Sequence, residues 1–211
     1  MFSLSQECKL CYLIDGPISG FDCGNTDLTD FFCNDAVKYQ NQLLGQTLFF
    51  RLKISDKIVC AFTLSNDSIK VGDLPNNRRR KIHKNIPHIK NKKSYPATLI
   101  GRFGVSVDFR KQHVGSAVMD FIKSICVTED VHKCRFLIVD AYNTEEAIRF
   151  YTSNDFAFVF STEEQEKEYY EKNKNKELKE DEHESDEEDK ELKTRFMYYD
   201  LLPWVEKLTE Q

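Results

Sequence analysis

The stretch Ala97–Val127 is predicted to form a strand, a short basic loop and an amphipathic helix in direct succession. Its first part is apolar and has the length of a strand. Apolar residues then recur with the spacing of one buried helix face: they are Val114, Ala117, Val118, Phe121, Ile122 and Ile125. The loop carries Arg110, Lys111 and His113 and enters the helix near Gly115. Free backbone N–H groups and the positive end of the helix dipole meet at such a loop. The pattern therefore predicts an anion site, with plain α/β packing as the alternative.

The composition indicates a chain with a substantial core. Hydrophobic residues make up 40% of its 211 residues, and the net charge is −5. The sequence has no apolar run of about 18 residues and no basic, apolar start, so we expect a cytoplasmic protein without a membrane role. Seven cysteines, an odd number, fit reduced thiols. Cys8 and Cys11 have zinc-type spacing but no second pair, so we expect no metal and interpret them as strand residues.

Further elements are predicted on both sides of the central stretch. Before it come a strand over Lys9–Ile14, a helix from Asp27 to Leu43 capped by Asn25 or Thr26 and ended by Gly45, and a hairpin of Thr47–Lys53 and Lys57–Ser65. After it come a strand over Cys134–Asp140, a helix whose start at Asn143 and Glu146 resembles a capping box and which ends near Asn154 or Asp155, strands over Phe156–Ser161 and Thr194–Leu201, and a short polar tail.

A basic insertion occupies about residues 72–95. It holds eight Lys and Arg residues between Arg78 and Lys93, and its prolines predict a loop or a short irregular helix. One interpretation is a platform for a polyanion such as tRNA, through Arg78, Arg79, Arg80 and Lys81, or for an acidic substrate. The alternatives are a solvated insertion or a partner for the acidic part of the same chain.

An acidic, low-complexity insertion occupies about residues 162–193, inside the last predicted hairpin. From Glu163 to Glu191 it contains fifteen Asp and Glu residues against six Lys. We expect a solvated helix in its first part and disorder in its acidic end. The segment is either a passive linker or a mimic of a polyanionic ligand that folds over the basic insertion.

Two motifs resemble the GCN5-related N-acetyltransferase (GNAT) family. GRFGVSVDFRKQHVGSAVMDFI is similar to the acetyl-CoA motif of the family, and IVDAYNTEEAIRFYTSNDF to the strand and helix that follow it. The resemblance implies one α/β GNAT domain over residues 1–211. Its mixed, mostly antiparallel, twisted sheet would have six or seven strands, flanked by helices, with a V-shaped splay between two central parallel strands at 97–107 and 134–140. The FDCG opening also looks like the GNAT toxins that acetylate aminoacyl-tRNA.

The resemblance further implies direct transfer of an acetyl group from acetyl-CoA to a primary amine, without a covalent enzyme intermediate. Tyr151 matches the residue that protonates the departing thiolate. The implied cofactor-binding residues are Phe103, Gly104, Val105, Arg110, Lys111, Gln112, His113, Val114, Gly115, Ser116, Asn143, Thr144 and Tyr151. Acetylation of aminoacyl-tRNA, and a degenerate protein that binds acyl-CoA or a partner without catalysis, are the alternatives. The acceptor, the general base and the oligomeric state, a homodimer included, stay open.

Two positions depart from the family pattern. His113 stands where the phosphate-binding loop has its middle glycine, and we expect it to keep a helical backbone. Asp155 replaces the glycine after the second helix and is expected to take the left-handed conformation of a helix C-cap. The asparagine position of the second motif falls on Thr144, one residue after Asn143, so either side chain is a candidate ligand of the pantetheine arm.

Overall fold

The computed structural model describes residues 3–84, 86–87, 92–128, 134–177 and 191–209. Seven strands form one sheet in the order β1-β2-β3-β4-β5-β7-β6. They are β1 Cys8–Tyr12, β2 Gln46–Leu52, β3 Ile58–Ile69, β4 Tyr95–Val105, β5 Phe136–Tyr142, β6 Ala157–Phe158 and β7 Thr194–Asp200. Only β4 and β5 run parallel, and the other neighbours are antiparallel. The mixed, mostly antiparallel sheet expected from the sequence is confirmed.

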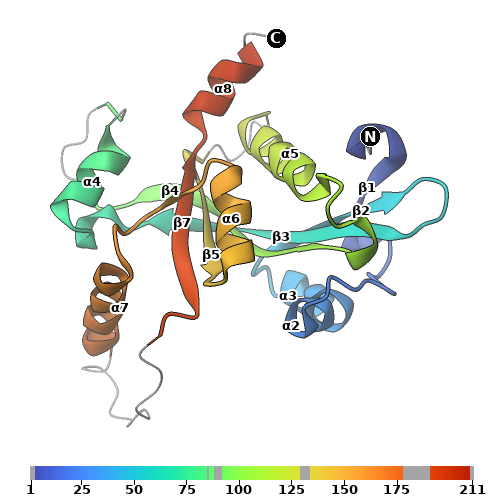
Figure 1. Ribbon diagram of the computed structural model, residues 1–211, viewed down its shortest axis with the longest axis horizontal. Helices are drawn as coiled ribbons and strands as arrows, with labels where there is room; N and C mark the ends of the chain where they lie inside the picture. Colours follow the sequence, from blue (N-terminus) through green and yellow to red (C-terminus); the bar gives the residue numbers. More distant parts are fainter. Residues whose placement is uncertain (1–2, 85, 88–91, 129–133, 178–190, 210–211) are drawn as a thin grey trace.

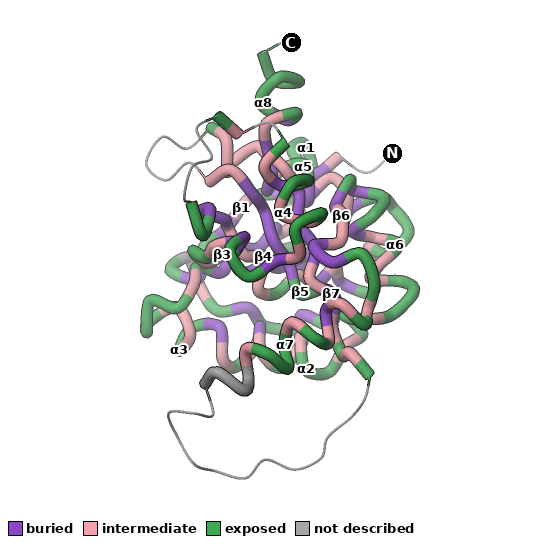
Figure 2. The backbone as a smooth tube through the Cα atoms, turned by 90° about the vertical axis from the view of Figure 1, so that its left-hand side faces the viewer, coloured by how far each residue is buried: buried purple, intermediate pink, exposed green. Residues whose placement is uncertain are grey.

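Helices cover both faces of the sheet (Figure 1). One face carries α1 Leu4–Glu7, α5 Val114–Thr128, α6 Glu145–Ser153 and α8 Leu202–Thr209. The other carries α2 Thr26–Asp30 and α3 Ala36–Asn41 at one end, and α4 Asn76–His83 and α7 Glu163–Glu177 at the other. The strands between these layers are largely buried, whereas the outward sides of the helices are exposed (Figure 2). None of the helices in the described ranges is long and apolar enough to cross a membrane.

The two parallel strands, β4 and β5, pair over a short distance and then diverge. Pairing between β4 and β5 covers only three positions and ends at Leu99 and Ile138, although both strands continue. Just beyond that point, the register of β4 against β3 slips by one residue, because Thr63 faces Arg102 whereas Leu64 faces Ile100. Gly101 is thus the extra residue of a β-bulge, which bends β4 away from β5. The V-shaped splay implied by the sequence is present, and its cause is this bulge.

The first helical region differs in detail from its prediction. Asn25 caps α2, since its side chain accepts the Leu28 N–H at 3.0 Å, as expected. The helix then widens into a π-helical turn over Phe31–Asp35 before α3 begins. It ends at Asn41, and Leu43 rather than Gly45 adopts the left-handed conformation, with φ of 60°. The helix therefore ends two residues before its predicted end at Leu43.

The two ends of the last hairpin also differ from expectation. The strand predicted over Phe156–Ser161 pairs with β7 at only two positions, and the predicted polar tail is helix α8. Trp204 of α8 is buried in the core, and its indole N–H donates to Ser124 of α5 at 3.2 Å. Residues 178–190, where disorder was expected, lie outside the described ranges.

Candidate active site

The splay exposes one backbone edge of β4. Phe103, Gly104 and Val105 pair with β3 on one side, but on the other side they lie beyond the last position shared with β5. Gly104 has a packing role as well, because a Cβ at this position would lie 3.1 Å from Cβ of Cys23. Packing against Cys23 therefore holds this edge of β4 in place, and its peptide groups face the opening between β4 and β5.

The loop that follows β4 contains two residues in the left-handed region. Lys111 has φ of 58° and His113 has φ of 60°. The expectation of a helical backbone at His113 was wrong, because this residue adopts the conformation that glycine takes without strain. The His113 carbonyl accepts the Ala117 N–H at 3.1 Å, so α5 starts directly after it. A histidine thus occupies a glycine-type position at the mouth of the candidate anion site.

Side chains fasten this loop to the rest of the protein. The Arg110 guanidinium donates to the carbonyl of Cys23, and Gln112 donates to the carbonyl of Asp108 at 3.2 Å. The Arg110 side chain is therefore a structural link, which no local sequence pattern predicted. Lys111 and His113 remain exposed beside the start of α5.

The first turn of α5 packs tightly against α6. Val114 is buried, and a Cβ on Gly115 would lie 2.8 Å from the Phe150 ring. The same Phe150 ring stacks on Phe103 of β4, with ring centres 5.2 Å apart. Glycine at position 115 therefore lets α5, α6 and β4 converge. The N–H groups of Val114, Gly115 and Ser116 belong to the first turn of α5 and have no acceptor within that helix.

Tyr151 is buried between α6 and the sheet. Its ring contacts those of Phe150 and Phe156 edge-on, at 5.1 and 5.4 Å between centres. Burial raises the pKa of the phenol well above its ordinary value, so it stays protonated at neutral pH. Its hydroxyl makes no hydrogen bond to any residue that the structure describes. The hydroxyl proton is thus available to a bound molecule.

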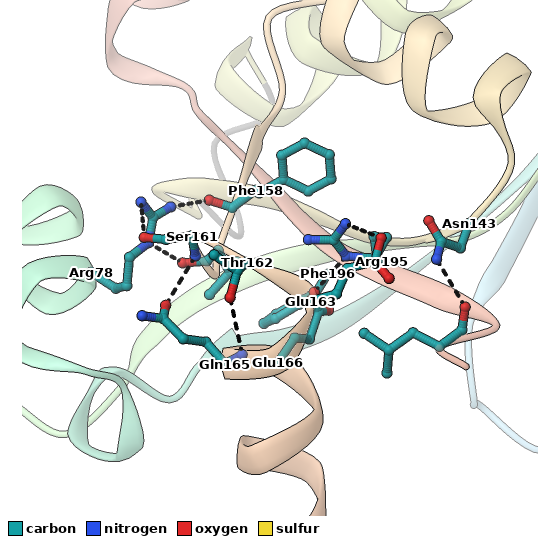
Figure 3. Close-up of polar contacts among 12 residues, drawn as sticks. Arg78, Asn143, Phe158, Ser161, Thr162, Glu163, Gln165, Glu166, Arg195 and Phe196 are labelled. Atoms are coloured by element: carbon teal, nitrogen blue, oxygen red, sulfur yellow. Dashed lines mark hydrogen bonds and ion pairs between the residues drawn. The ribbon is translucent and has the colours of Figure 1, made fainter. Parts of the chain in front are cut away.

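The two candidate pantetheine ligands after β5 have roles within the chain. Thr144, not Asn143, is the N-cap of α6, and its hydroxyl accepts the Ala147 N–H at 3.3 Å. The Asn143 amide donates to the Leu192 carbonyl at 3.0 Å, which fixes the entry of β7 (Figure 3). The predicted capping box was therefore wrong by one residue. The C-cap prediction was right, since Asp155 has φ of 67°.

Sequence reasoning missed a buried lysine that ties α5 to α6. Lys123 is 1% exposed, and its ammonium group donates to the Asn154 carbonyl at 2.9 Å. It also lies 4.2 Å from the centre of the Tyr199 ring. Burial lowers the pKa of Lys123, which the nearby Asp120 partly opposes. The contact holds the C-terminal end of the helix that carries Tyr151, and no local sequence pattern marked it.

The basic insertion forms a helix whose arginines are partly used inside the molecule. In α4, Ile82 is buried in the core, so this segment is more than a solvated loop. Arg78 donates to the carbonyls of Phe158 and Val159 (Figure 3). Arg79 donates to the carbonyls of Val71, Gly72 and Leu74. Of the four predicted tRNA-binding residues, Arg80 and Lys81 are exposed, whereas Arg78 and Arg79 stabilise the fold.

The start of the acidic insertion is also integrated. Glu166 of α7 is 0% exposed, and its carboxylate accepts the Phe196 N–H and pairs with Arg195 at 2.8 Å (Figure 3). Glu163 pairs with the same guanidinium at 3.1 Å. Tyr169 packs on Phe160 of the core, with ring centres 5.0 Å apart. The expectation of a merely solvated helix was therefore wrong for this part.

The paired cysteines near the N-terminus point apart. Cys8 belongs to the core under α5, whereas Cys11 belongs to the core under α2 and α3, on the opposite face. The spacing of these two residues therefore does not produce a shared metal site. In the described ranges, no group of three His, Cys, Asp or Glu residues is placed to hold a metal ion.

Comparison with known proteins agrees with this geometry. Residues 79–156 match the model of the acetyltransferase (GNAT) family. This span contains β4, the loop, α5, β5 and α6, and therefore the splay and Tyr151. No match was found among the curated proteins.

Solved structures extend the likeness to nearly the whole chain. A tyrosine-to-phenylalanine mutant of KacT has a TM-score of 0.64 at 17% identity, covering 96% of this chain and 99% of its own. AtaT complexed with acetyl-methionyl-tRNAfMet has a TM-score of 0.62 at 16% identity, covering 96% and 99%. AtaTR bound with AcCoA has a TM-score of 0.63 at 16% identity, covering 96% and 98%. At these identities, the likeness establishes the fold.

Proposed function

We propose that this chain, which carries a GNAT acetyltransferase domain and is an N-acetyltransferase, transfers the acetyl group of acetyl-CoA directly to a primary amine. The observation that carries the proposal is the splay of β4 from β5, next to the first turn of α5 and the hydroxyl of the buried Tyr151. The reduced cysteines, none of which forms a disulfide in the structure, favour the cytoplasm as its compartment.

The site residues divide the work of binding. Peptide groups of Phe103, Gly104 and Val105 would pair with the amide-bearing pantetheine arm as a neighbouring strand would. The N–H groups at the start of α5, with Lys111 and His113 beside them, would hold the pyrophosphate. The side chains of Arg110, Gln112, Asn143 and Thr144 fix the surrounding backbone and contribute to binding through the shape they hold.

The chemistry needs an amine, a thioester and one proton donor. The neutral amine attacks the thioester carbonyl carbon, a C–N bond forms and the C–S bond breaks. The CoA thiolate then takes the proton of the Tyr151 hydroxyl, and the phenolate is reprotonated by the surplus proton of the new amide nitrogen through solvent. Burial of Tyr151 favours this role because it makes the phenolate costly. The hydroxyl therefore keeps its proton until the CoA thiolate, a strong base, forms.

The proposal is tested with labelled acetyl-CoA. The full chain is incubated separately with charged total tRNA, with deacylated tRNA and with a panel of primary amines, while thiol release is followed. We expect one acceptor to gain label in step with thiol release. Binding of acetyl-CoA without transfer to any acceptor would contradict the proposal and favour the degenerate, non-catalytic alternative.

Aminoacyl-tRNA is the second candidate acceptor. AtaT, whose structure is similar, has been solved in complex with acetyl-methionyl-tRNAfMet. On the chain itself, Arg80 and Lys81 of α4 and the following Lys84 are exposed. Cations at such positions attract the phosphate backbone.

Neutralising these three cations by Arg80→Gln, Lys81→Gln and Lys84→Gln tests this candidate. If they contact phosphates, the slope of log affinity for tRNA against log salt concentration should fall by about 2–3, because each lost contact removes roughly 0.7–0.9 from it. A charge-matched control neutralises the exposed Lys9, Lys38 and Lys172. Equal slopes in the two variants would argue against a role of α4. Arg78 and Arg79 are left intact because they stabilise the fold.

His113→Gly tests the glycine-type position in the loop. The left-handed backbone costs a residue with a Cβ roughly 1–2 kcal/mol, and glycine relieves this but gains freedom in the unfolded chain. We expect an unfolding free energy that is unchanged or up to about 1 kcal/mol higher. Acetyl-CoA binding should be weaker, because the side chain beside the pyrophosphate is lost. Denaturant unfolding and calorimetry measure the two. In the control Gln112→Gly, where no strain is relieved, stability should drop; a similar drop in His113→Gly would contradict the strain argument.

A further inference from the structure

One carboxylate of β5 lies on the face of the sheet opposite to Tyr151. Side chains of β5 alternate, so Leu137, Val139 and Ala141 join the core under α5 and α6 together with Tyr151. Phe136 and Ile138 join the core of the opposite face. Asp140 continues this second set; part of its surface is open to solvent, although the surrounding protein partly desolvates it. The carboxylate therefore faces the side away from the proton donor.

Asp140 also borders the splay. The last position that β5 shares with β4 is Ile138 opposite Leu99, so Asp140 comes two residues further on, where the bulge at Gly101 has turned β4 away. On its other side, β5 continues to pair with β7, and Asp140 lies opposite Phe196. The residue thus stands at the open side of a rigid strand, next to the space in which the thioester is proposed to lie.

Charged or titratable groups of four other elements, β3, α7, β7 and β4, belong to the surroundings of this carboxyl group. Asp67 of β3 lies on the same face, because it pairs with Ala97 of β4, which shares the core of Phe136. Glu166 and Tyr170 project from α7, and Arg195 of β7 neutralises Glu166. Burial raises the pKa of Asp140, and the charges of Glu166 and Asp67 raise it further. Arg102 of β4 points to the same face and stacks over the Phe31 ring at 5.0 Å.

The Asp140 carboxylate has no hydrogen-bond or ion-pair partner within the described part of the chain. It makes no hydrogen bond and no ion pair there, unlike Glu166 and Asp200, whose carboxylates are both paired. A partly desolvated carboxylate without a partner is a good acceptor for an ammonium proton, and a raised pKa makes it a stronger base.

We propose that Asp140 is the general base of the transfer: it binds the ammonium group of the acceptor at the open side of β5 and removes one proton from it. This assignment rests on the proposed acetyl transfer. The ammonium N–H bond breaks, and the proton goes to the Asp140 carboxylate and then to solvent. The amine lone pair so released attacks the thioester carbon, while Tyr151 protonates the departing thiolate from the other face. The proton donor and the proton acceptor thus approach the reacting carbon from opposite sides of the splay.

The test compares Asp140→Asn with the unaltered chain, with methionyl-tRNA and spermidine as the two acceptor probes. We expect kcat/KM at pH 7 to fall by about 10²–10⁴, with acetyl-CoA affinity and thermal unfolding unchanged. Asp140→Glu should restore part of the rate. In Asp140→Asn, the remaining rate should rise with pH in step with deprotonation of the amine itself, because the enzyme no longer supplies a base.

Asp67→Asn provides the matched control on the same face. Removing its charge should lower the pKa of Asp140, so the acidic limb of the pH–rate profile should shift to lower pH while the plateau stays the same. If the unaltered chain acetylates a probe and Asp140→Asn keeps its rate within about threefold, Asp140 is not the general base. The proposed acetyl transfer is then still supported. If the unaltered chain acetylates neither probe, the proposed function fails for them, and the assignment of Asp140 fails with it.

Discussion

Replacing Tyr151 by phenylalanine is expected to lower kcat for acetyl transfer by about 10²–10⁴, the usual worth of one positioned proton donor. The substitution removes only the hydroxyl, so the edge-on contacts with Phe150 and Phe156 remain. Acetyl-CoA should bind with nearly the same affinity, because the backbone edge of β4 and the start of α5 are untouched. Steady-state thiol release and calorimetric binding measure the two quantities.

Tyr198→Phe is the matched control for this variant. Tyr198 is also a buried tyrosine, but it belongs to the core on the opposite face of the sheet. Its hydroxyl should not matter for transfer. A Tyr151→Phe variant with normal kcat and only a changed KM would show that Tyr151 packs α6 and does not donate the proton. Because burial raises the pKa of Tyr151, the rate of the unaltered chain should show no loss of this proton up to the ordinary tyrosine pKa.

Replacing Glu166 by alanine is expected to lower the free energy of unfolding by about 3–5 kcal/mol, the typical cost of removing one partner of a buried ion pair. Arg195 is 7% exposed, so its charge would stay nearly inaccessible to solvent, with Glu163 as its remaining ion-pair partner among the described residues. The Phe196 N–H would lose its acceptor as well. Burial raises the pKa of Glu166 although Arg195 and the Phe196 amide lower it, so desolvation outweighs the attraction.

A double-mutant cycle separates the pair from its surroundings. If the penalty comes from an isolated buried charge, Glu166→Leu combined with Arg195→Leu should cost clearly less than the sum of the two single variants. Glu168→Ala is the control on the same helix; Glu168 is exposed, and its change should stay within about 0.5 kcal/mol. Urea unfolding of the five variants gives these values. Equal losses for Glu166→Ala and Glu168→Ala would contradict the structural role of α7.

Local patterns in the sequence predicted the central elements well. The apolar period of α5, the Asn25 cap and the left-handed Asp155 each depend on residues within a few positions of one another, and each is present. The fold followed from two contiguous motifs, and the structure confirms it. Residues 79–156, which contain both motifs, match the model of the acetyltransferase (GNAT) family.

The errors concern side chains whose partners lie far away in the chain. Arg78 finds its acceptors 80 and 81 residues further on, and Glu166 finds Arg195 29 residues further on. In the sequence, both residues look like members of solvated charge runs, because nothing local distinguishes them from their neighbours. His113 is a different case, since its backbone conformation is imposed by the loop against the preference of the residue.

The contact between Glu166 and Phe196 also affects the backbone edge of β7, where the sheet ends beside the short strand β6. Strand β6 supplies only two paired positions, so β7 would otherwise present unsatisfied peptide groups, a template on which a second chain can add a strand. A carboxylate from the acidic insertion occupies one of these groups and closes that edge. A segment with the composition of a linker thus occupies a peptide group that a strand of another chain would need for β-pairing.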